Sequence, residues 1–502
     1  MKKNDQHTPK YAPDSLPSAY QAFLEKYPAY KDAKLDQLRS TEYSRLESQE
    51  QIYLDYTGGG LYAESQLRQH LELLSSGVFG NPHSHNPTSL AMTELVDRAR
   101  AYVLEYFNAS PDEYLAIFTP NASGALKLVG ESYPFTNGSR YVLFFDNHNS
   151  VNGIREYART RGASITYVPV IAPELTIDQP SLDRALADND PAYHNLFAYP
   201  AQSNFSGVQH PLEYIKLAQD KGWDVLVDCA AFAPTNRLDI SRWKPDFATF
   251  SFYKIFGYPT GLGCLLMRKE MLNKLQRPWF AGGTITISSV QGDGHYLHDN
   301  EAAFEDGTVD YLNIPAIEIG LRYINDINID QIHKRVMCLT GWLLEQLVAL
   351  QHNNGLPLIH IHGPASTEKR GGTVTISLYD TNGVPIDDHW IEELANYEKI
   401  SLRTGCFCNP GAGEIAHGLS QHHMTTFFEQ NKRISFMELR QIMQERFYKS
   451  VSAVRISVGI ASNFNDVYHF MQFISGFLNK TSEQVGIATY DRHSAHMLRD
   501  SA

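Results

Sequence analysis

The sequence predicts an α/β protein whose large domain is built on a mostly parallel, seven-stranded sheet and is followed by a smaller α+β domain. Short apolar runs alternate with helical segments, and continuous apolar strands separated by helices are typical of a parallel sheet covered on both faces. Two further strand-like runs follow a long helical stretch at 324–350. The seven apolar runs are LAIFT (115–119), RYVLFFD (140–146), SITYVPV (164–170), NLFAYP (195–200), DVLVD (224–228), FATFSF (247–252) and GCLLM (263–267).

The chain of 502 residues is long enough for two or three domains. Residues 1–50 are polar with helix-like pieces, which predicts an N-terminal helical arm. We expect the large domain over 51–330 and the small domain over 331–480, the latter with strands at 373–380 and 454–460. A polar tail over 481–502 completes the chain.

Composition excludes several functional classes. A hydrophobic fraction of 43% and a charged fraction of 20% are ordinary for a globular protein. The net charge of −13 argues against nucleic acid as a partner, and no apolar run reaches the length of a membrane span. The five cysteines are sparse and no apolar segment follows the first lysines, so we expect a cytoplasmic protein.

Lys254 is the first candidate for chemistry, in the stretch SFYKIFGYPTGLG (251–263). Aromatic residues and glycines surround this lysine, and burial among them would disfavour its ammonium form and lower its pKa. A neutral amine is a nucleophile that can hold an aldehyde cofactor covalently. The alternative is an ion-paired lysine with its amine at the surface.

Three polar residues follow other apolar runs, and ligands bind beyond the carboxyl ends of the strands in an open parallel sheet. Asp228 could pair with a protonated pyridine nitrogen or cap the next element. His148 could stack on an aromatic cofactor or lie in solvent. Asn204 could donate to a phenolate oxygen or form an Asx-turn.

The turn TPNASG (119–124) precedes a helical segment that opens at Ala125. Its small residues leave backbone N–H groups free to hold a phosphate, and Ser123, next to Gly124, adds a hydroxyl donor. Such turns also occur without a ligand. Taken with the residues at the other strand ends, this turn indicates pyridoxal 5′-phosphate as the cofactor.

A second informative stretch is LRTGCFCNPG (402–411), which predicts an exposed loop. Arg403 would favour a thiolate on a neighbouring cysteine, whereas a buried thiol would be inert. A metal site is a further alternative, although the spacings do not match structural zinc patterns. Its ligands would be Cys406 and Cys408 with His417, His422 or His423.

Arg455, in VRISVGI (454–460), is the first candidate for substrate binding, and Arg403 of the cysteine loop is the second. A guanidinium binds a carboxylate through two parallel hydrogen bonds, so Arg455 could hold the α-carboxylate of an amino acid. The alternative is an ion pair at the surface.

With these residues in view, the chain resembles the class V aminotransferase and cysteine desulfurase family, and within it the N-terminal desulfurase domain of the molybdenum cofactor sulfurases. The resemblance runs from about residue 20 to 475 and implies a fold-type I transferase that depends on pyridoxal phosphate. The matching stretches include IYLDYTGGGLY (52–62), FTPNASGALKLV (118–129), PAQSNFSG (200–207), SFYKIFGYPTGLGCLLMR (251–268), FEDGT (304–308) and LRTGCFCNPGAGE (402–414).

The resemblance also implies a role for each candidate. Lys254 would bind the cofactor aldehyde, with Asp228 at the pyridine nitrogen, His148 on the ring and Asn204 at the ring oxygen. The phosphate would be held by Ser123 and Ser251, and by Thr308 of a neighbouring subunit, which implies a homodimer. Arg455 would bind the substrate carboxylate. Cys408, which ends the pattern arginine-x-glycine-x-x-cysteine that begins at Arg403, would accept the sulfur.

The predicted function is that of a cysteine desulfurase, which takes sulfur from L-cysteine as a persulfide on Cys408 and releases alanine. The chain departs from the family at Tyr253, where histidine is common beside the cofactor, at Ala231, and at Thr57–Gly60. Another reaction on cysteine, a thioether of it or another amino acid is therefore the alternative: C–S or β-elimination, transamination or epimerisation. A catalytically silent scaffold is a third reading. The sulfur acceptor would be a separate protein, because the chain ends without the C-terminal domain of the sulfurases.

Overall fold

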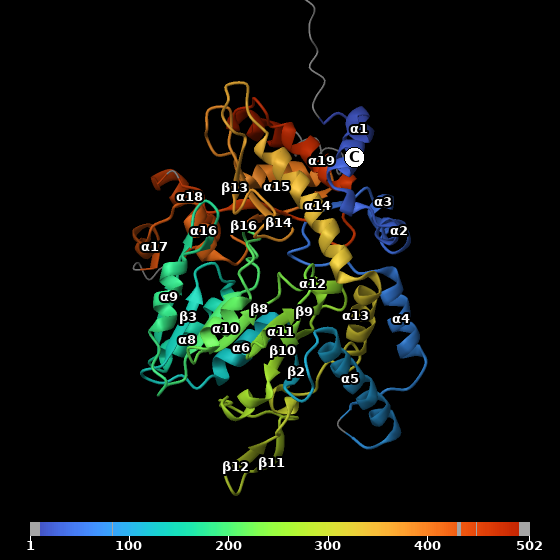
Figure 1. Ribbon diagram of the computed structural model, residues 1–502, viewed down its shortest axis with the longest axis vertical. Helices are drawn as coiled ribbons and strands as arrows, with labels where there is room; N and C mark the ends of the chain where they lie inside the picture. Colours follow the sequence, from blue (N-terminus) through green and yellow to red (C-terminus); the bar gives the residue numbers. More distant parts are fainter. Residues whose placement is uncertain (1–10, 83, 429–432, 448, 491–502) are drawn as a thin grey trace, which may run out of the picture.

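The structure of the protein is a computed structural model that describes residues 11–490 apart from 83, 429–432 and 448. Its largest sheet has seven strands in the order β2-β10-β9-β8-β7-β3-β4 (Figure 1). Neighbouring strands are parallel except at β10, which is antiparallel to β2 and β9. The predicted mostly parallel sheet is confirmed. Its strands are β2 (Tyr114–Thr119), β3 (Arg140–Phe144), β4 (Ser164–Val168), β7 (Leu196–Pro200), β8 (Asp224–Asp228), β9 (Phe247–Ser251) and β10 (Gly263–Arg268).

Both faces of this sheet are buried, because successive side chains of a strand point to opposite faces. In β7, Phe197 and Tyr199 belong to the main apolar core, whereas Leu196 and Ala198 belong to a second core that includes residues of α6 and α8. The large-domain helices are α4 (Glu64–Ser75), α5 (Pro87–Tyr106), α6 (Ala122–Ser132), α7 (Asn149–Asn152), α8 (Ile154–Thr160), α9 (Gln179–Ala187), α10 (Glu213–Gln219), α11 (Ile240–Trp243), α12 (Phe252–Phe256) and α13 (Pro315–Ile327).

The second unit is built on a four-stranded antiparallel sheet of order β13-β14-β17-β16. Its first helix, α14, follows α13 at Asn328, beside the expected boundary at 330, which stays a prediction. The strands are β13 (Ile359–His362), β14 (Thr373–Leu378), β16 (Arg403–Gly405) and β17 (Ala453–Ser457). The helices are α14 (Ile329–Val348), α15 (Asp388–Tyr397), α16 (Pro410–Ala416), α17 (Gln421–Phe428), α18 (Phe436–Phe447) and α19 (Phe464–Ser475).

The N-terminal helices α1 (Leu16–Lys26), α2 (Ala33–Thr41) and α3 (Arg45–Ser48) lie beside α14 and α19 (Figure 1). The Phe23 ring of α1 packs 4.6 Å from the ring of Phe464. The chain then enters β1 (Ile52–Tyr53), which pairs in parallel with β15 (Ile400–Ser401). Residues 52–57 are thereby fixed to the small domain, and Gly60 then contacts Tyr253 of the large domain.

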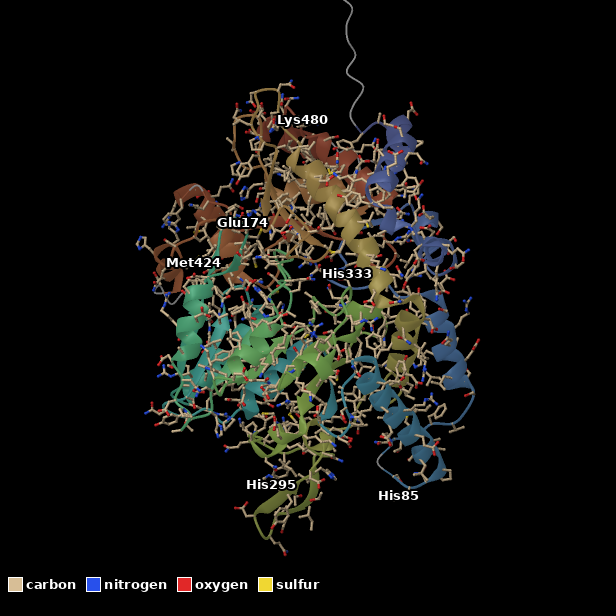
Figure 2. All side chains as sticks on the ribbon, viewed as in Figure 1. His85, Glu174, His295, His333, Met424 and Lys480 are labelled. Atoms are coloured by element: carbon tan, nitrogen blue, oxygen red, sulfur yellow. The ribbon has the colours of Figure 1, made fainter. Side chains whose placement is uncertain are left out.

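A hairpin of β11 (Ile285–Ser289) and β12 (Gly294–Leu297) projects from the lower end of the molecule, where Figure 2 labels His295. Beyond the small domain, residues 482–490 of the expected polar tail form a helix, and residues 491–502 lie outside the described residues. In the described part of the chain, we find no helix with the length and apolar character needed to cross a bilayer.

The sheet core gives a direct test of the fold. Leu226 is fully buried in the centre of β8, so Leu226→Ala should lower the free energy of unfolding by about 2–5 kcal/mol through lost burial and the cavity left behind. Val290→Ala, at the fully exposed tip of the hairpin, should change it by less than about 0.5 kcal/mol. Urea denaturation measures both, and equal effects would contradict the fold.

Candidate active site

A cavity of about 290 Å³ lies at the carboxyl ends of the central strands. Residues that are far apart in sequence line it, because the parallel strands all end at this edge of the sheet. The predicted site residues in its lining are Ser123, His148, Asn204, Asp228, Ser251, Tyr253 and Lys254. The structure thus brings together seven of the residues that the sequence singled out.

Lys254 follows β9 on the short helix α12, which ends at Gly257 in the left-handed conformation. Burial lowers the pKa of its amine, with the Asp228 carboxylate opposing this shift and the Arg455 guanidinium adding to it. The backbone here touches the glycine turn of 57–60, where Gly60 donates to the carbonyl of Tyr253 at 3.0 Å. A Cβ at Gly60 would lie 2.9 Å from the Lys254 carbonyl oxygen, so this close approach requires glycine.

Asp228 at the end of β8 and His148 before α7 line the same cavity. Asp228 ends β8, is 7% exposed, and accepts a hydrogen bond from the Ala230 N–H at 2.9 Å. The Nδ1 of His148 accepts from the Ser150 N–H at 3.1 Å. Burial lowers the pKa of His148 although Asp228 raises it, which favours the neutral imidazole suited to stacking on an aromatic ring.

The N-terminus of α6 provides the predicted phosphate position. Asn121 caps this helix by accepting from the Gly124 N–H at 3.0 Å, and the Ser251 hydroxyl accepts from the Ala122 N–H at 2.9 Å. The Ser123 hydroxyl lies 2.6 Å from that of Ser150. Two hydroxyls and the positive end of a helix therefore border the cavity together, an arrangement that binds anions.

The predicted cysteine loop packs against the rim of the cavity through backbone hydrogen bonds. Phe407 and Cys408 both adopt left-handed backbone angles, with φ of 56° and 55°. Asn149 donates to the Cys408 carbonyl at 2.7 Å, and Asn204 donates its side-chain N–H to the Phe407 carbonyl at the same distance. These bonds hold an unfavourable backbone in place.

The thiols of this loop differ in environment. Cys408 is exposed, and Cys406 is half-buried, which raises its pKa. The exposed thiol lies outside the lining of the cavity. Among the residues that the structure describes, no group of three histidine, cysteine or acidic side chains could hold a metal ion. The ring of His417 lies 5.2 Å from that of His362.

Arg455 makes an ion pair, as one of the two readings of the sequence expects, but the pair is buried. Its Nη2 lies 3.0 Å from Asp55, and its side chain is only 3% exposed. Arg403 binds the other oxygen of Asp55 through Nη2 at 2.6 Å and Nε at 3.0 Å. Sequence reasoning missed Asp55. The available signal was one carboxylate inside the apolar stretch IYLDY (52–56).

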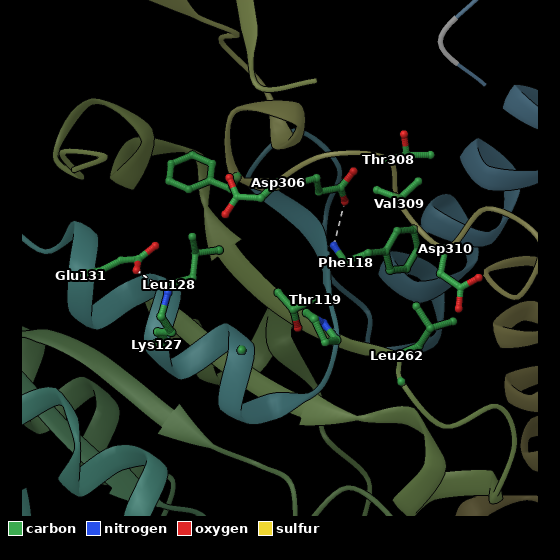
Figure 3. A pocket seen from close by; sticks show the side chains of 15 residues that line it. Phe118, Thr119, Lys127, Leu128, Glu131, Leu262, Asp306, Thr308, Val309 and Asp310 are labelled. Carbon is green, nitrogen blue, oxygen red and sulfur yellow. Dashed lines mark hydrogen bonds and ion pairs between the residues drawn. The ribbon is translucent and has the colours of Figure 1, made fainter. Parts of the chain in front are cut away.

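Thr308 and Gly124 border a second cavity, of about 410 Å³, which Figure 3 shows from close by. Lys127 and Asp306 also line it, and it shares only Pro120 and Gly261 with the first cavity. Thr308 is therefore outside the site of its own chain. Its predicted contact with the phosphate of a neighbouring subunit stays a prediction.

Comparison with known proteins settles the family. The family model described as Aminotransferase class-V matches residues 52–470. The chain belongs to this family. It is 35% identical to the molybdenum cofactor sulfurase of Solanum lycopersicum over 92% of this chain and 60% of that protein, and 32% identical to that of Homo sapiens over 89% and 51%. This class V chain thus spans between half and three fifths of the length of these relatives.

Solved structures agree on the fold of this class V chain. The apo cysteine desulfurase from Thermococcus onnurineus NA1 matches with a TM-score of 0.73 and 22% identity, over 88% of this chain and 98% of that one. The cysteine desulfurase CsdA from Escherichia coli matches with a TM-score of 0.68 and 19% identity, over 89% and 98%. The predicted fold, that of the fold-type I transferases, is confirmed.

The cavity also fits the cofactor of this family, pyridoxal 5′-phosphate, as the sequence predicted. The half-buried Lys254, whose amine has a lowered pKa, could bind the aldehyde, and Asp228 lines the cavity where it could pair with the pyridine nitrogen. The α6 N-terminus and its hydroxyls meet the needs of a phosphate. The individual roles of these residues stay predictions.

The histidines beside the cysteine loop predict how stability depends on pH. Burial lowers the pKa of His362 from 6.5 to about 2, so the folded protein keeps this ring neutral while the unfolded chain protonates it below pH 6.5. His362 therefore destabilises the fold by about 1.4 kcal/mol for each pH unit below 6.5. Between about pH 6.5 and 4.5, the free energy of unfolding of His362→Gln should therefore fall by roughly 3 kcal/mol less than that of the wild type. Urea denaturation across this range checks it, with the exposed His295→Gln as the control that should keep the wild-type slope.

Proposed function

We propose that the protein is a pyridoxal-phosphate-dependent cysteine desulfurase that moves the sulfur of L-cysteine to Cys408 and releases alanine. The observation that most supports this proposal is that Lys254 and the loop of Cys408 lie at the same cavity. The cavity holds the Lys254 amine with a lowered pKa. The exposed Cys408 is fastened by its carbonyl to Asn149, the residue after His148.

Residues of this chain would hold the cofactor and move the proton. Lys254, Asp228, Ser123 and Ser251 would bind the aldehyde, the pyridine nitrogen and the phosphate. The chemistry that the bound cofactor supplies is withdrawal of electrons from the Cα of the amino acid. The Lys254 amine, whose pKa is lowered by burial, would accept the Cα proton.

Cys408 would then act as the nucleophile. Its thiolate attacks the substrate sulfur, a bond forms between the two sulfur atoms, and the bond from that sulfur to Cβ breaks. The electron pair of the broken bond remains on the carbon side and takes up a proton, which gives alanine. Because Cys408 is exposed, a separate acceptor protein could then reach the persulfide.

Elimination is the second candidate, and one observation favours it. Cys408 is outside the lining of the cavity, whereas Lys254, which suffices for elimination, is inside it. In that reaction the sulfur would leave as sulfide, and the carbon skeleton would leave as pyruvate with ammonia. Tyr253 also lines the cavity, at a position where the family commonly has histidine, and this difference from the family motivates the alternative reaction.

The protein would act as a homodimer. Thr308 borders the 410 Å³ cavity, which meets the first cavity at Pro120 and Gly261. A second copy that approaches from this side could place its own Thr308 near the phosphate position. The arrangement would complete each site with a residue that its own chain holds elsewhere.

The thiol gives the test of the reaction. Cys408→Ala should lower the rate of alanine formation from L-cysteine at least about a hundredfold, because the sulfur loses its acceptor, while the visible absorbance of the bound cofactor persists. Cys406→Ala, the half-buried neighbour, should retain most of the activity. Product analysis separates the candidates: pyruvate and ammonia from both variants would indicate elimination, and unchanged alanine formation by Cys408→Ala would contradict the proposal.

A further inference from the structure

One carboxylate joins the two arginines that the sequence offered for substrate binding. Asp55 is held from the backbone, since its segment pairs through β1 with β15 and by a bridge between Asp55 and Ser457 of β17. Its side chain lies between Arg403 of β16 and Arg455 of β17. We call Asp55, Arg403 and Arg455 the Asp55 cluster.

Each oxygen of Asp55 serves one arginine of the cluster. Oδ1 accepts from Arg455 at 3.0 Å, and Oδ2 accepts from Arg403 at 2.6 and 3.0 Å. Burial differs strongly along the cluster: side-chain exposure is 3% at Arg455, 11% at Asp55 and 51% at Arg403. The cluster therefore reaches from the protein interior to solvent.

The cluster lies beside the cavity. Nη1 of Arg455 donates to the backbone carbonyl of Asn204 at 3.0 Å, and Asn204 lines the cavity together with Lys254. All three members act electrostatically on Lys254: the arginines lower the pKa of its amine and Asp55 raises it. Space is also tight, because a Cβ at Gly58 would lie 2.4 Å from Oδ2 of Asp55.

Arg455 keeps a donor available. Its Nε is buried and has no hydrogen-bond partner in the described part of the chain. A buried guanidinium N–H without an acceptor is costly, and a ligand carboxylate would satisfy it. Arg455 is not part of the cavity lining, but it is joined to it through Asn204. The ion pair with Asp55 leaves the Nε–H of Arg455 without an acceptor among the described residues, which a substrate carboxylate would supply.

Charge counting then assigns a role to Asp55. The cluster carries two positive charges and one negative charge, a net charge of +1. One substrate carboxylate brings this to zero, whereas a substrate with two would leave an excess negative charge in a partly buried site. We propose that Asp55 is a specificity-determining residue that makes the site select amino acids with one carboxylate over those with a second acidic group. The inference rests on the proposed function and on the predicted role of Arg455 as the residue that binds the substrate carboxylate.

The size of the effect follows from Coulomb's law. Without Asp55, a second carboxylate about 6 Å from the uncompensated charge gains roughly a hundredfold in affinity at the effective dielectric constant of a protein surface. Salt and the half-exposed Arg403 reduce this gain. We expect a change in selectivity of at least about tenfold.

Two unreactive thiols that differ by one carboxylate provide the probes: 3-mercaptopropionate and mercaptosuccinate. Calorimetric titration of the cofactor-loaded protein gives the ratio of their affinities. Asp55→Asn, with a cluster charge of +2, should shift this ratio toward mercaptosuccinate at least about tenfold. The double variant Asp55→Asn with Arg403→Gln restores +1 and should return the ratio to near the wild-type value.

Arg403→Gln supplies a test if Asp55→Asn does not fold. Its cluster charge is zero, so mercaptosuccinate should lose about tenfold more affinity than 3-mercaptopropionate, whereas Arg403→Lys should weaken both equally. A ratio that stays constant across the charge series, or a shift that persists in the double variant, would overturn the proposal.

The probes lack an amino group and do not react, so this result is independent of the reaction. If alanine forms from L-cysteine but the ratio of the two affinities stays constant across the variants, only the role of Asp55 is refuted. If the affinity ratios change as expected but no alanine forms from L-cysteine, only the desulfurase reaction is refuted.

Discussion

The placement of the half-buried Lys254 just beyond the carboxyl end of β9 is the constraint on which the site depends. The parallel pairing of β8 with β9 places Asp228 opposite Thr249. Thr249 lies two residues before Ser251, the N-cap of α12, which carries Lys254. Burial lowers the pKa of the amine, and the nearby Asp228 carboxylate opposes this shift. The same sheet edge brings His148 and the α6 N-terminus to the cavity.

The small domain contributes to this site through polar contacts and through the packing of the Phe407 ring against Phe205, 5.4 Å between ring centroids. The Asn409 amide donates to the Asp146 carbonyl at 2.6 Å and to Asn204 at 3.0 Å, and Asn149 holds the Cys408 carbonyl. The bonds fix where the loop lies while the Cys408 thiol stays exposed. A thiol that must take sulfur from one molecule and give it to another needs both properties.

The fold could be predicted from the sequence because its signals are local. Each of the seven apolar runs became a strand, and the polar residues after them met where parallel strands end. The Asp55 cluster could not be predicted, because its bonds join residues 348 and 400 positions apart. Nothing near Arg455 in sequence indicates that its partner is Asp55, or that burial turns the expected surface ion pair into an internal one. Thr308 and Lys254 line different cavities, and this arrangement likewise depends on packing between elements that are distant in sequence.

The most direct test of the account is the pKa of the Lys254 amine itself. Reductive ¹³C-methylation of the cofactor-free protein, with assignment by Lys254→Arg, allows the amine to be titrated by NMR. The account predicts a pKa below the ordinary lysine value of 10.5 in the wild type, and a lower one still in Asp228→Asn, because that carboxylate raises it. A pKa at or above 10.5 would contradict the central claim that burial keeps this amine nucleophilic.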